Sequence, residues 1–253
     1  MAQQATRYGL VLSGGGARGF AHLGAVKALK EKGLEPSAFS GASAGSIAAA
    51  FLSDGYEPEE VLEIFLNQNL FRIIGLSIPR KGLGNIHGLD KLLKKHLRSK
   101  RIEDLRIPAF FAATDLNHGK AVYFSEGELV PRVIASASIP ILFQPVIIDG
   151  IHYTDGGVVD NLPFKPLAGR CDELIGVDVN PGGYLDDFKS LITIAERVFY
   201  LSFSHASKES LSEFSLMIRP EGLDQFSWFD LSHSRQIFEA GYKSARQHLE
   251  NKR

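Results

Sequence analysis

Short apolar runs alternate with longer amphipathic stretches along most of this chain. Apolar positions at helical spacing predict helices at 20–32, 44–52, 185–207 and 232–251. The short apolar runs at 9–12, 38–41, 107–116, 173–180 and 214–220 are typical of buried strands. Strands that alternate with helices form parallel sheets covered on both faces. We therefore expect an α/β protein with three α/β/α layers and a mostly parallel central sheet.

Two turn signals predict hairpins within this pattern. Asp149-Gly150 separates two apolar runs, and this dipeptide favours a two-residue hairpin turn. A second turn at 117–119 (Asn-His-Gly) joins the strand 107–116 to a further strand at 120–127. The sequence has no internal repeat and no obvious interdomain linker. We expect a polar tail at residues 1–7 and a single domain over residues 8–253.

The bulk composition excludes several classes of function. Hydrophobic residues make up 44% of the 253 positions, which is ample for a core, and the formal net charge of −1 provides no basic field for nucleic acid. Cys171 is the only cysteine, which excludes an internal disulfide and a multi-cysteine zinc site; we expect no metal and no cofactor. The first residues are polar and no apolar run is long enough to span a bilayer. We expect a cytoplasmic protein, either soluble or peripheral to a membrane.

A glycine-rich loop follows the first predicted strand. Gly14, Gly16 and Gly19 fit G-x-G-x-x-G between a strand and a helix, where backbone N–H groups bind either a phosphate or an oxyanion. A dinucleotide site also needs an acidic residue about 20 positions later, and that neighbourhood holds only Phe39-Ser40-Gly41. The oxyanion interpretation therefore fits better, with Arg18 holding the loop by hydrogen bonds.

A candidate nucleophile comes next. Gly41-Ala42-Ser43-Ala44-Gly45 fits G-x-S-x-G, in which the serine occupies a sharp turn between strand and helix and the glycines leave room for the bend. Its hydroxyl lies at a helix N-terminus, which favours developing negative charge. The plain alternative is that these small residues only pack a helix against a sheet.

A serine nucleophile needs a base, and four aspartates end predicted strands. Asp149 suits the hairpin turn, and Asp115 and Asp178 are explained as loop caps. Asp155 differs, because Gly156 and Gly157 after it allow close backbone approach. A Ser–Asp–His triad also stays open by chain order, with His205, His233 and His248 as candidates, although each is better explained as a surface histidine.

The ordered set of motifs resembles the patatin-like phospholipases, which are lipid acyl hydrolases. The resemblance rests on the glycine loop 14–19, the serine turn 41–45, the segment 135–140 (Ala-Ser-Ala-Ser-Ile-Pro) and the segment 155–163 that begins at Asp155. It implies a patatin-like fold and a Ser–Asp dyad in which Ser43 is the nucleophile and Asp155 the general base. It also implies an oxyanion hole at Gly15 and Gly16, supported by the motif residues Gly14, Arg18, Gly19, Gly41, Gly45, Gly156 and Gly157.

Two segments bear on lipid contact. The apolar stretch 69–84 is either a lid or acyl-chain wall, or ordinary core. The basic amphipathic stretch 88–101 is either a solvated surface helix, which we favour, or a membrane-surface helix. We expect a phospholipase, lysophospholipase or carboxylesterase that acts on fatty-acyl esters or phospholipids. The alternatives are a catalytically silent patatin-like regulatory or binding module and a dinucleotide-dependent oxidoreductase.

Overall fold

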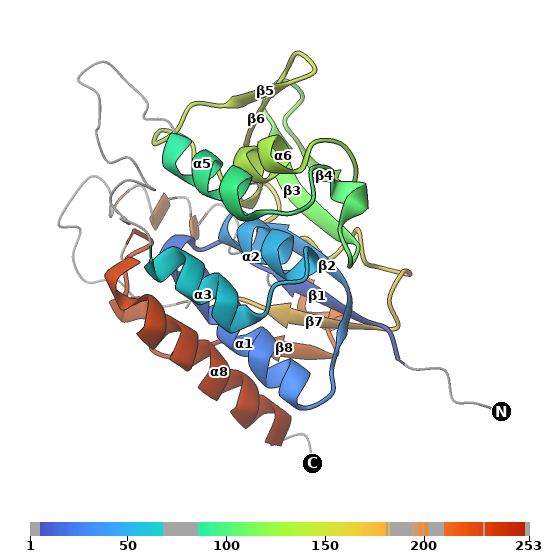
Figure 1. Cartoon of the computed structure of the whole chain (residues 1–253), viewed down its shortest axis with the longest axis vertical. Helices are drawn as coiled ribbons and strands as arrows, with labels where there is room; N and C mark the ends of the chain where they lie inside the picture. The colour runs from blue at the N-terminus through green and yellow to red at the C-terminus, as the bar shows by residue number, and fades with distance from the viewer. Residues whose placement is uncertain are drawn as a thin grey trace.

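A twisted eight-stranded sheet runs through the middle of the molecule (Figure 1). The computed structural model describes residues 6–67, 86–180, 182, 194, 197–198, 200–201, 210–229 and 231–250. In the order of the sheet, the strands are β5 (Val146–Ile148), β6 (Ile151–Asp155), β3 (Ala109–Asp115), β2 (Pro36–Ala42), β1 (Tyr8–Leu12), β7 (Glu173–Val177) and β8 (Leu216–Ile218), and β4 (Lys120–Phe124) pairs with β3.

The sheet is parallel at its centre and antiparallel at one side. β1 pairs in parallel with β2 and β7, and the parallel pairing continues to β3 and β8. β4 and the β5–β6 hairpin run antiparallel to this core. Asp149 and Gly150 have φ of 51° and 80°, as a two-residue hairpin turn with both central residues left-handed requires. The predicted α/β class and hairpin are confirmed, and the antiparallel strands make the sheet mixed.

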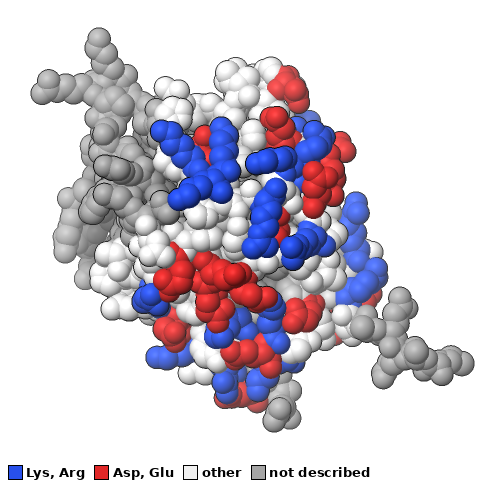
Figure 2. Space-filling view, in the orientation of Figure 1, with Lys and Arg blue, Asp and Glu red and all other residues white. Residues whose placement is uncertain are grey.

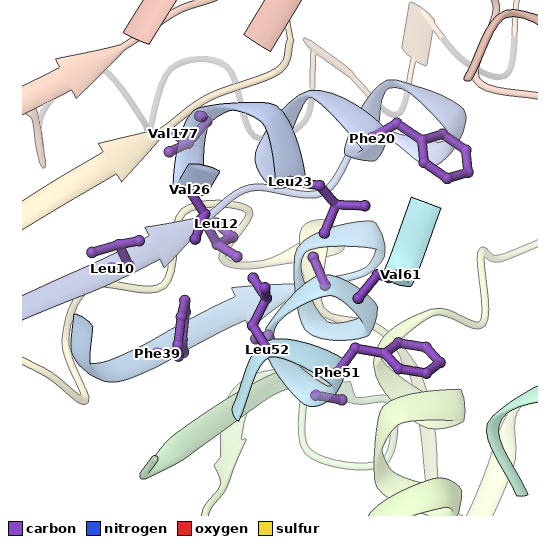
Figure 3. Packing of buried hydrophobic residues seen from close by; sticks show 14 of the residues in the cluster. Leu10, Leu12, Phe20, Leu23, Val26, Phe39, Phe51, Leu52, Val61 and Val177 are labelled. Carbon is purple, nitrogen blue, oxygen red and sulfur yellow. The ribbon is translucent and has the colours of Figure 1, made fainter. Parts of the chain in front are cut away.

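Helices cover the face of the sheet nearest the viewer in Figure 1. They are α1 (Phe20–Glu31), α2 (Ala44–Ser53), α3 (Pro58–Leu66), α5 (His87–His96), α6 (Leu129–Ser136) and α8 (Ser234–Glu250). Leu10 and Leu12 of β1 belong to the large core beneath α1 and α2, as Figure 3 shows. Val11 points to the other face and packs with Leu162 and Leu167. Burial on both faces explains why this strand is a continuous apolar run.

Three predicted segments either lie outside the described residues or form a shorter helix than expected. The helix expected at 185–207 and the apolar stretch 69–84 lie largely or wholly outside the described residues. The amphipathic stretch 88–101 forms a helix only to His96, and Leu97 has an extended backbone. Its four leucines (Leu89, Leu92, Leu93 and Leu97) are buried in the main core, so the apolar face of α5 packs inside the protein and the solvated alternative is favoured. Of the described helices, none is long and apolar enough to cross a membrane.

Candidate active site

Ser43 lies at a strained turn between β2 and α2. Its φ of 52° and ψ of −121° are unusual for a residue with a Cβ atom, and such strain is typical of a nucleophile turn. The flanking glycine is required by space, because a Cβ atom at Gly45 would lie 2.1 Å from the carbonyl oxygen of Leu12. The turn therefore packs directly on β1, and Ser43 itself is 5% exposed.

A buried serine of α6 holds this turn from the other side. The Ser43 N–H donates to Ser136 Oγ at 3.1 Å, and Ser136 Oγ donates to the Ala112 carbonyl at 2.5 Å. Ser136 Oγ also lies 2.7 Å from Ser46 Oγ, whose hydroxyl is 2.7 Å from the Gly41 carbonyl. Ser136 thus links the nucleophile turn to β3 and α2.

Asp155, the last residue of β6, is fully buried beside this turn. Its N–H donates to the Ser138 carbonyl at 2.9 Å, and its Oδ1 accepts from the Gly157 N–H at 2.8 Å. Burial raises the pKa of Asp155 to about 7, against the opposing effects of hydrogen bonds from the Ser43 side chain and the Gly157 N–H. The Ser43 hydroxyl is therefore close enough to act on this pKa. Asp155 Oδ2 nevertheless has no well-formed hydrogen bond to any described residue.

The glycine loop adjoins Ser43. A Cβ atom at Gly14 would lie 3.1 Å from Ser43 Cβ, and one at Gly19 would lie 2.6 Å from Ala44 Cβ. The Gly14 N–H donates to the Asn161 carbonyl at 3.3 Å and the Ala17 N–H to the Trp228 carbonyl at 2.6 Å. The N–H groups of Gly15 and Gly16, which lie between them, donate no hydrogen bond to the described part of the chain. Two unengaged donors thus lie next to a helix N-terminus and a serine hydroxyl.

An apolar pocket of about 130 Å³ adjoins Ser43. Its floor and walls come from the glycine loop, α1, α2, α3, the start of α5, the segment 137–143, and Trp228, Phe229 and Leu231. Apart from Ser43, the described side chains that line it are apolar, and they are Ala17, Phe20, Leu23, Ala44, Ile47, Ala48, Val61, Phe65, Ile86, Leu89, Ala137, Ile139, Phe143, Trp228, Phe229 and Leu231. Such a lining suits a hydrocarbon chain and excludes a charged ligand.

A family model described as patatin-like phospholipase matches residues 10–168, from the first strand to beyond Asp155. The chain belongs to this family. An uncharacterized NTE family protein of Mycobacterium tuberculosis is 33% identical over 177 residues, which cover 69% of this chain and 49% of that protein. The lysophospholipase NTE1 of Kluyveromyces lactis is 27% identical over 280 residues, which cover 96% of this chain and 19% of that protein. The chain thus spans about half or less of the length of these relatives.

The fold of this chain is similar to that of a solved structure. VipD from Legionella pneumophila has a TM-score of 0.63 at 16% sequence identity, and the match covers 98% of this chain and 67% of that chain. At this identity the likeness concerns the fold. The family model and the fold thus agree on a patatin-like domain.

Three polar residues that support the glycine loop were not found from the sequence. His22 of α1 is fully buried, and its Nε2 lies 2.7 Å from the Ser13 carbonyl. Burial lowers the pKa of His22 to about 4, so the ring is neutral at pH 7 and Nε2–H is the donor. Asn180 Nδ2 donates to the Gly14 carbonyl at 2.8 Å, and Ser13 Oγ accepts from the Val179 N–H at 3.0 Å. In the sequence, the only sign of this network was His22, a polar residue on the apolar face of a predicted helix.

Arg18 contacts the segment that also binds the glycine loop. Its Nε donates to the Phe226 carbonyl at 2.8 Å, two residues before Trp228, whose carbonyl accepts from Ala17 N–H. Arg18 and Ala17 thus contact the same segment, and the bracing role of Arg18 stays a prediction.

The other aspartates have structural roles. Asp115 accepts hydrogen bonds from the backbone N–H of Asn117 and of His118 at 3.0 Å each, which closes the β3–β4 turn. Asp149 occupies the hairpin turn. Asp178 accepts from the Asn180 N–H at 3.1 Å and pairs with Arg219 at 3.4 Å.

Two of the three histidines considered for a triad have other contacts. His248 Nδ1 lies 2.8 Å from the Ser244 carbonyl on α8, and the His233 ring packs against Phe226 with ring centres 5.4 Å apart. His205 lies outside the described residues. Within the described chain, no group of three or more His, Cys, Asp or Glu residues is arranged to hold a metal ion.

Proposed function

We propose that this chain is a serine lipid acyl hydrolase that uses Ser43 and Asp155 as a catalytic dyad. One arrangement carries the proposal. A strained serine, a buried carboxylate whose pKa is near neutrality and the two unengaged N–H groups of Gly15 and Gly16 converge beside an apolar pocket. Membership of a lipid hydrolase family supports the same reaction class.

The reaction proceeds in two halves. Asp155 accepts the Ser43 proton while Ser43 Oγ attacks the ester carbonyl, and the N–H groups of Gly15 and Gly16 donate to the oxyanion. The tetrahedral intermediate collapses, and protonated Asp155 returns the proton to the departing alkoxide. Water then gives its proton to Asp155 and attacks the acyl-serine, after which collapse releases the fatty acid and the proton returns to Ser43 Oγ. A pKa near neutrality suits a group that both accepts and donates this proton.

The substrate class follows from the pocket beside the nucleophile. The apolar lining accommodates the fatty-acyl chain, which leaves the polar alcohol portion of the ester outside the pocket. Fatty-acyl esters, including phospholipids and lysophospholipids, share this chemistry. The alternative is a silent patatin-like module that binds lipid without hydrolysing it, and the next experiment separates the two.

Ser43→Ala is expected to lower the hydrolysis of a p-nitrophenyl ester by at least about 10⁴-fold, because it removes the nucleophile. A fluorophosphonate probe should label the wild-type chain at Ser43 alone, as mapped by peptide mass spectrometry. Ser40→Ala is the matched control, since Ser40 is a buried serine of β2 whose hydroxyl has no hydrogen-bond partner among the described residues. Lipid binding without probe labelling would favour the silent module, and a label on another serine would refute the assignment of Ser43.

Ser136→Ala is expected to lower kcat about ten- to one-hundred-fold with little change in KM. The loss of the Ser136 hydroxyl leaves the buried Ser43 N–H without an acceptor and frees the nucleophile turn to shift. Ser136→Thr keeps a hydroxyl and should recover most of kcat.

Ser138→Ala is the control for this positioning role. The Ser138 hydroxyl donates to the Ile134 carbonyl on α6, whereas the contact with Asp155 is made by the Ser138 backbone. Equal kcat losses in Ser136→Ala and Ser138→Ala would indicate a general weakening of this segment and would remove the specific role of Ser136.

A further inference from the structure

A turn between two residues that line the pocket carries an isoleucine in an unfavourable conformation. Ile141 is 76% exposed and has a φ of 72°. A β-branched residue at positive φ is a true outlier, and such outliers persist only where the surrounding structure imposes them. Here a hydrogen bond of 2.9 Å from the Phe143 N–H to the Ile139 carbonyl closes the turn around Ile141. Ile139 and Phe143 both line the pocket, so the turn holds an exposed apolar side chain beside the pocket.

Helix α5 borders the same pocket through Leu89 and presents positive charge to solvent. Its apolar side is buried, and Lys91, Lys94 and Lys95 are exposed. Residues 87–101 contain six Lys or Arg and one Asp, in a chain of net charge −1. Figure 2 shows Lys and Arg gathered over α5.

An acidic group lies on α3, which also borders the pocket. Helix α3 carries Glu59, Glu60 and Glu63, and Glu57 precedes it. Figure 2 shows this acidic group below the basic group of α5. Glu57, Glu59 and Glu63 are paired with Lys30, Lys27 and Arg235. An anionic plane would therefore be attracted to the α5 side of the pocket more strongly than to the α3 side, which favours one orientation of approach.

We propose that Ile141 and the exposed lysines of α5 form a docking surface for an anionic lipid bilayer. The identity of the partner rests on the proposed function, since a lipid hydrolase must reach its ester in a lipid surface. Stable attachment to a membrane needs an apolar contact combined with basic charge, and this surface provides both next to the pocket. The buried apolar side of α5 takes no part; its polar side faces the bilayer while Ile141 inserts.

The apolar contact is tested with the Ile141→Asn substitution in a chain that also carries Ser43→Ala. Because Ser43→Ala removes the proposed nucleophile, the vesicle lipids are not hydrolysed during the measurement. Binding to vesicles of phosphatidylcholine with phosphatidylglycerol is measured by cosedimentation. Asparagine tolerates positive φ, so the turn should keep its conformation while partitioning falls about ten-fold. Ile147→Asn is the matched control, because Ile147 is 62% exposed on β5 while its neighbours Val146 and Ile148 pack inward. Unchanged binding of Ile141→Asn, or an equal loss in Ile147→Asn, would overturn the proposal.

The charge contribution is tested with a triple variant, Lys91→Gln, Lys94→Gln and Lys95→Gln. Each lysine near an anionic surface changes partitioning about five-fold, so the variant should bind these vesicles about one-hundred-fold more weakly at low salt. It should bind pure phosphatidylcholine vesicles like the parent. The control removes three exposed lysines elsewhere on the chain, with Lys32→Gln, Lys165→Gln and Lys243→Gln. Equal losses in both triple variants would show a net-charge effect and refute the docking surface.

A soluble short-chain ester separates this proposal from the proposed function. With Ser43 present, the docking variants should hydrolyse that ester at the wild-type rate and lose activity only on vesicles. Failure of the wild-type chain to hydrolyse the soluble ester would refute the proposed function, while the vesicle binding of the Ser43→Ala chain would still decide the docking surface.

Discussion

Replacement of Asp155 by asparagine is expected to remove ester hydrolysis and to stabilise the folded chain at alkaline pH. Without a base at this position Ser43 keeps its proton, and we expect a loss of about 10⁴-fold in kcat. In the wild type, kcat/KM should fall about ten-fold per pH unit below the Asp155 pKa of about 7, as the carboxylate becomes protonated.

The stability effect follows from the same pKa. The folded-state pKa of Asp155, about 7, is higher than the value of about 3.9 in an unfolded chain, so the folded state binds this proton more tightly. The buried carboxylate therefore destabilises the fold above pH 7, and this cost disappears as the pH falls toward 4. From about pH 5.5 to pH 8 the wild type should lose about 2 kcal/mol of unfolding free energy through this group.

Urea unfolding of the wild type and of Asp155→Asn at pH 5.5 and pH 8 measures the contribution of Asp155 to the unfolding free energy. His22, whose pKa is also shifted, is present in both chains, so its contribution cancels in the difference. The unfolding free energy of the Asp155→Asn variant should not show the fall between pH 5.5 and pH 8 that Asp155 causes in the wild type. Parallel pH dependences would contradict the buried, near-neutral carboxylate, and full activity of Asp155→Asn would refute the dyad.

Gly16→Ala is expected to lower kcat by about 10²- to 10³-fold, the usual effect of losing one oxyanion donor. A Cβ atom at Gly16 would lie 2.3 Å from the Trp228 carbonyl oxygen, and φ is 58°. The loop must move away from Trp228, which weakens the hydrogen bond that the Trp228 carbonyl accepts from Ala17. The N–H groups of Gly15 and Gly16 would then no longer point at the oxyanion.

Gly119→Ala provides the control for backbone strain. Gly119 has a similar φ of 66°, but a Cβ atom there would have nothing within 4 Å. This variant should lose about 1 kcal/mol of stability and keep its activity. Steady-state kinetics and thermal unfolding of both variants make the comparison, and wild-type kcat in Gly16→Ala would remove the loop from the mechanism.

The local elements could be predicted because their signals are local. Strand β1, the serine turn and the β5–β6 hairpin each depend on a few consecutive residues, whose apolar pattern or turn glycines set the backbone conformation. The order of the glycine loop, the serine turn and the segment after Asp155 predicted the family, and the family model confirms it. The sequence predicts a longer helix than α5, because Leu97 continues the apolar spacing. In the structure the helix ends at His96, and the backbone of Leu97 is extended.

The candidate site depends on contacts between residues far apart in the chain. Ser136 reaches the Ser43 N–H across 93 positions, and Asn180 reaches the Gly14 carbonyl across 166 positions, which no periodicity can reveal. The sequence by itself determined the strands, helices α1, α2 and α8, the family and the candidate nucleophile and base, because backbone preferences act over a few residues. Only the tertiary structure decided that Asp155 is buried, that its pKa is near 7 and that an apolar pocket adjoins Ser43. Desolvation and cavity shape arise from all the neighbouring elements together, so they exist only after the chain has folded.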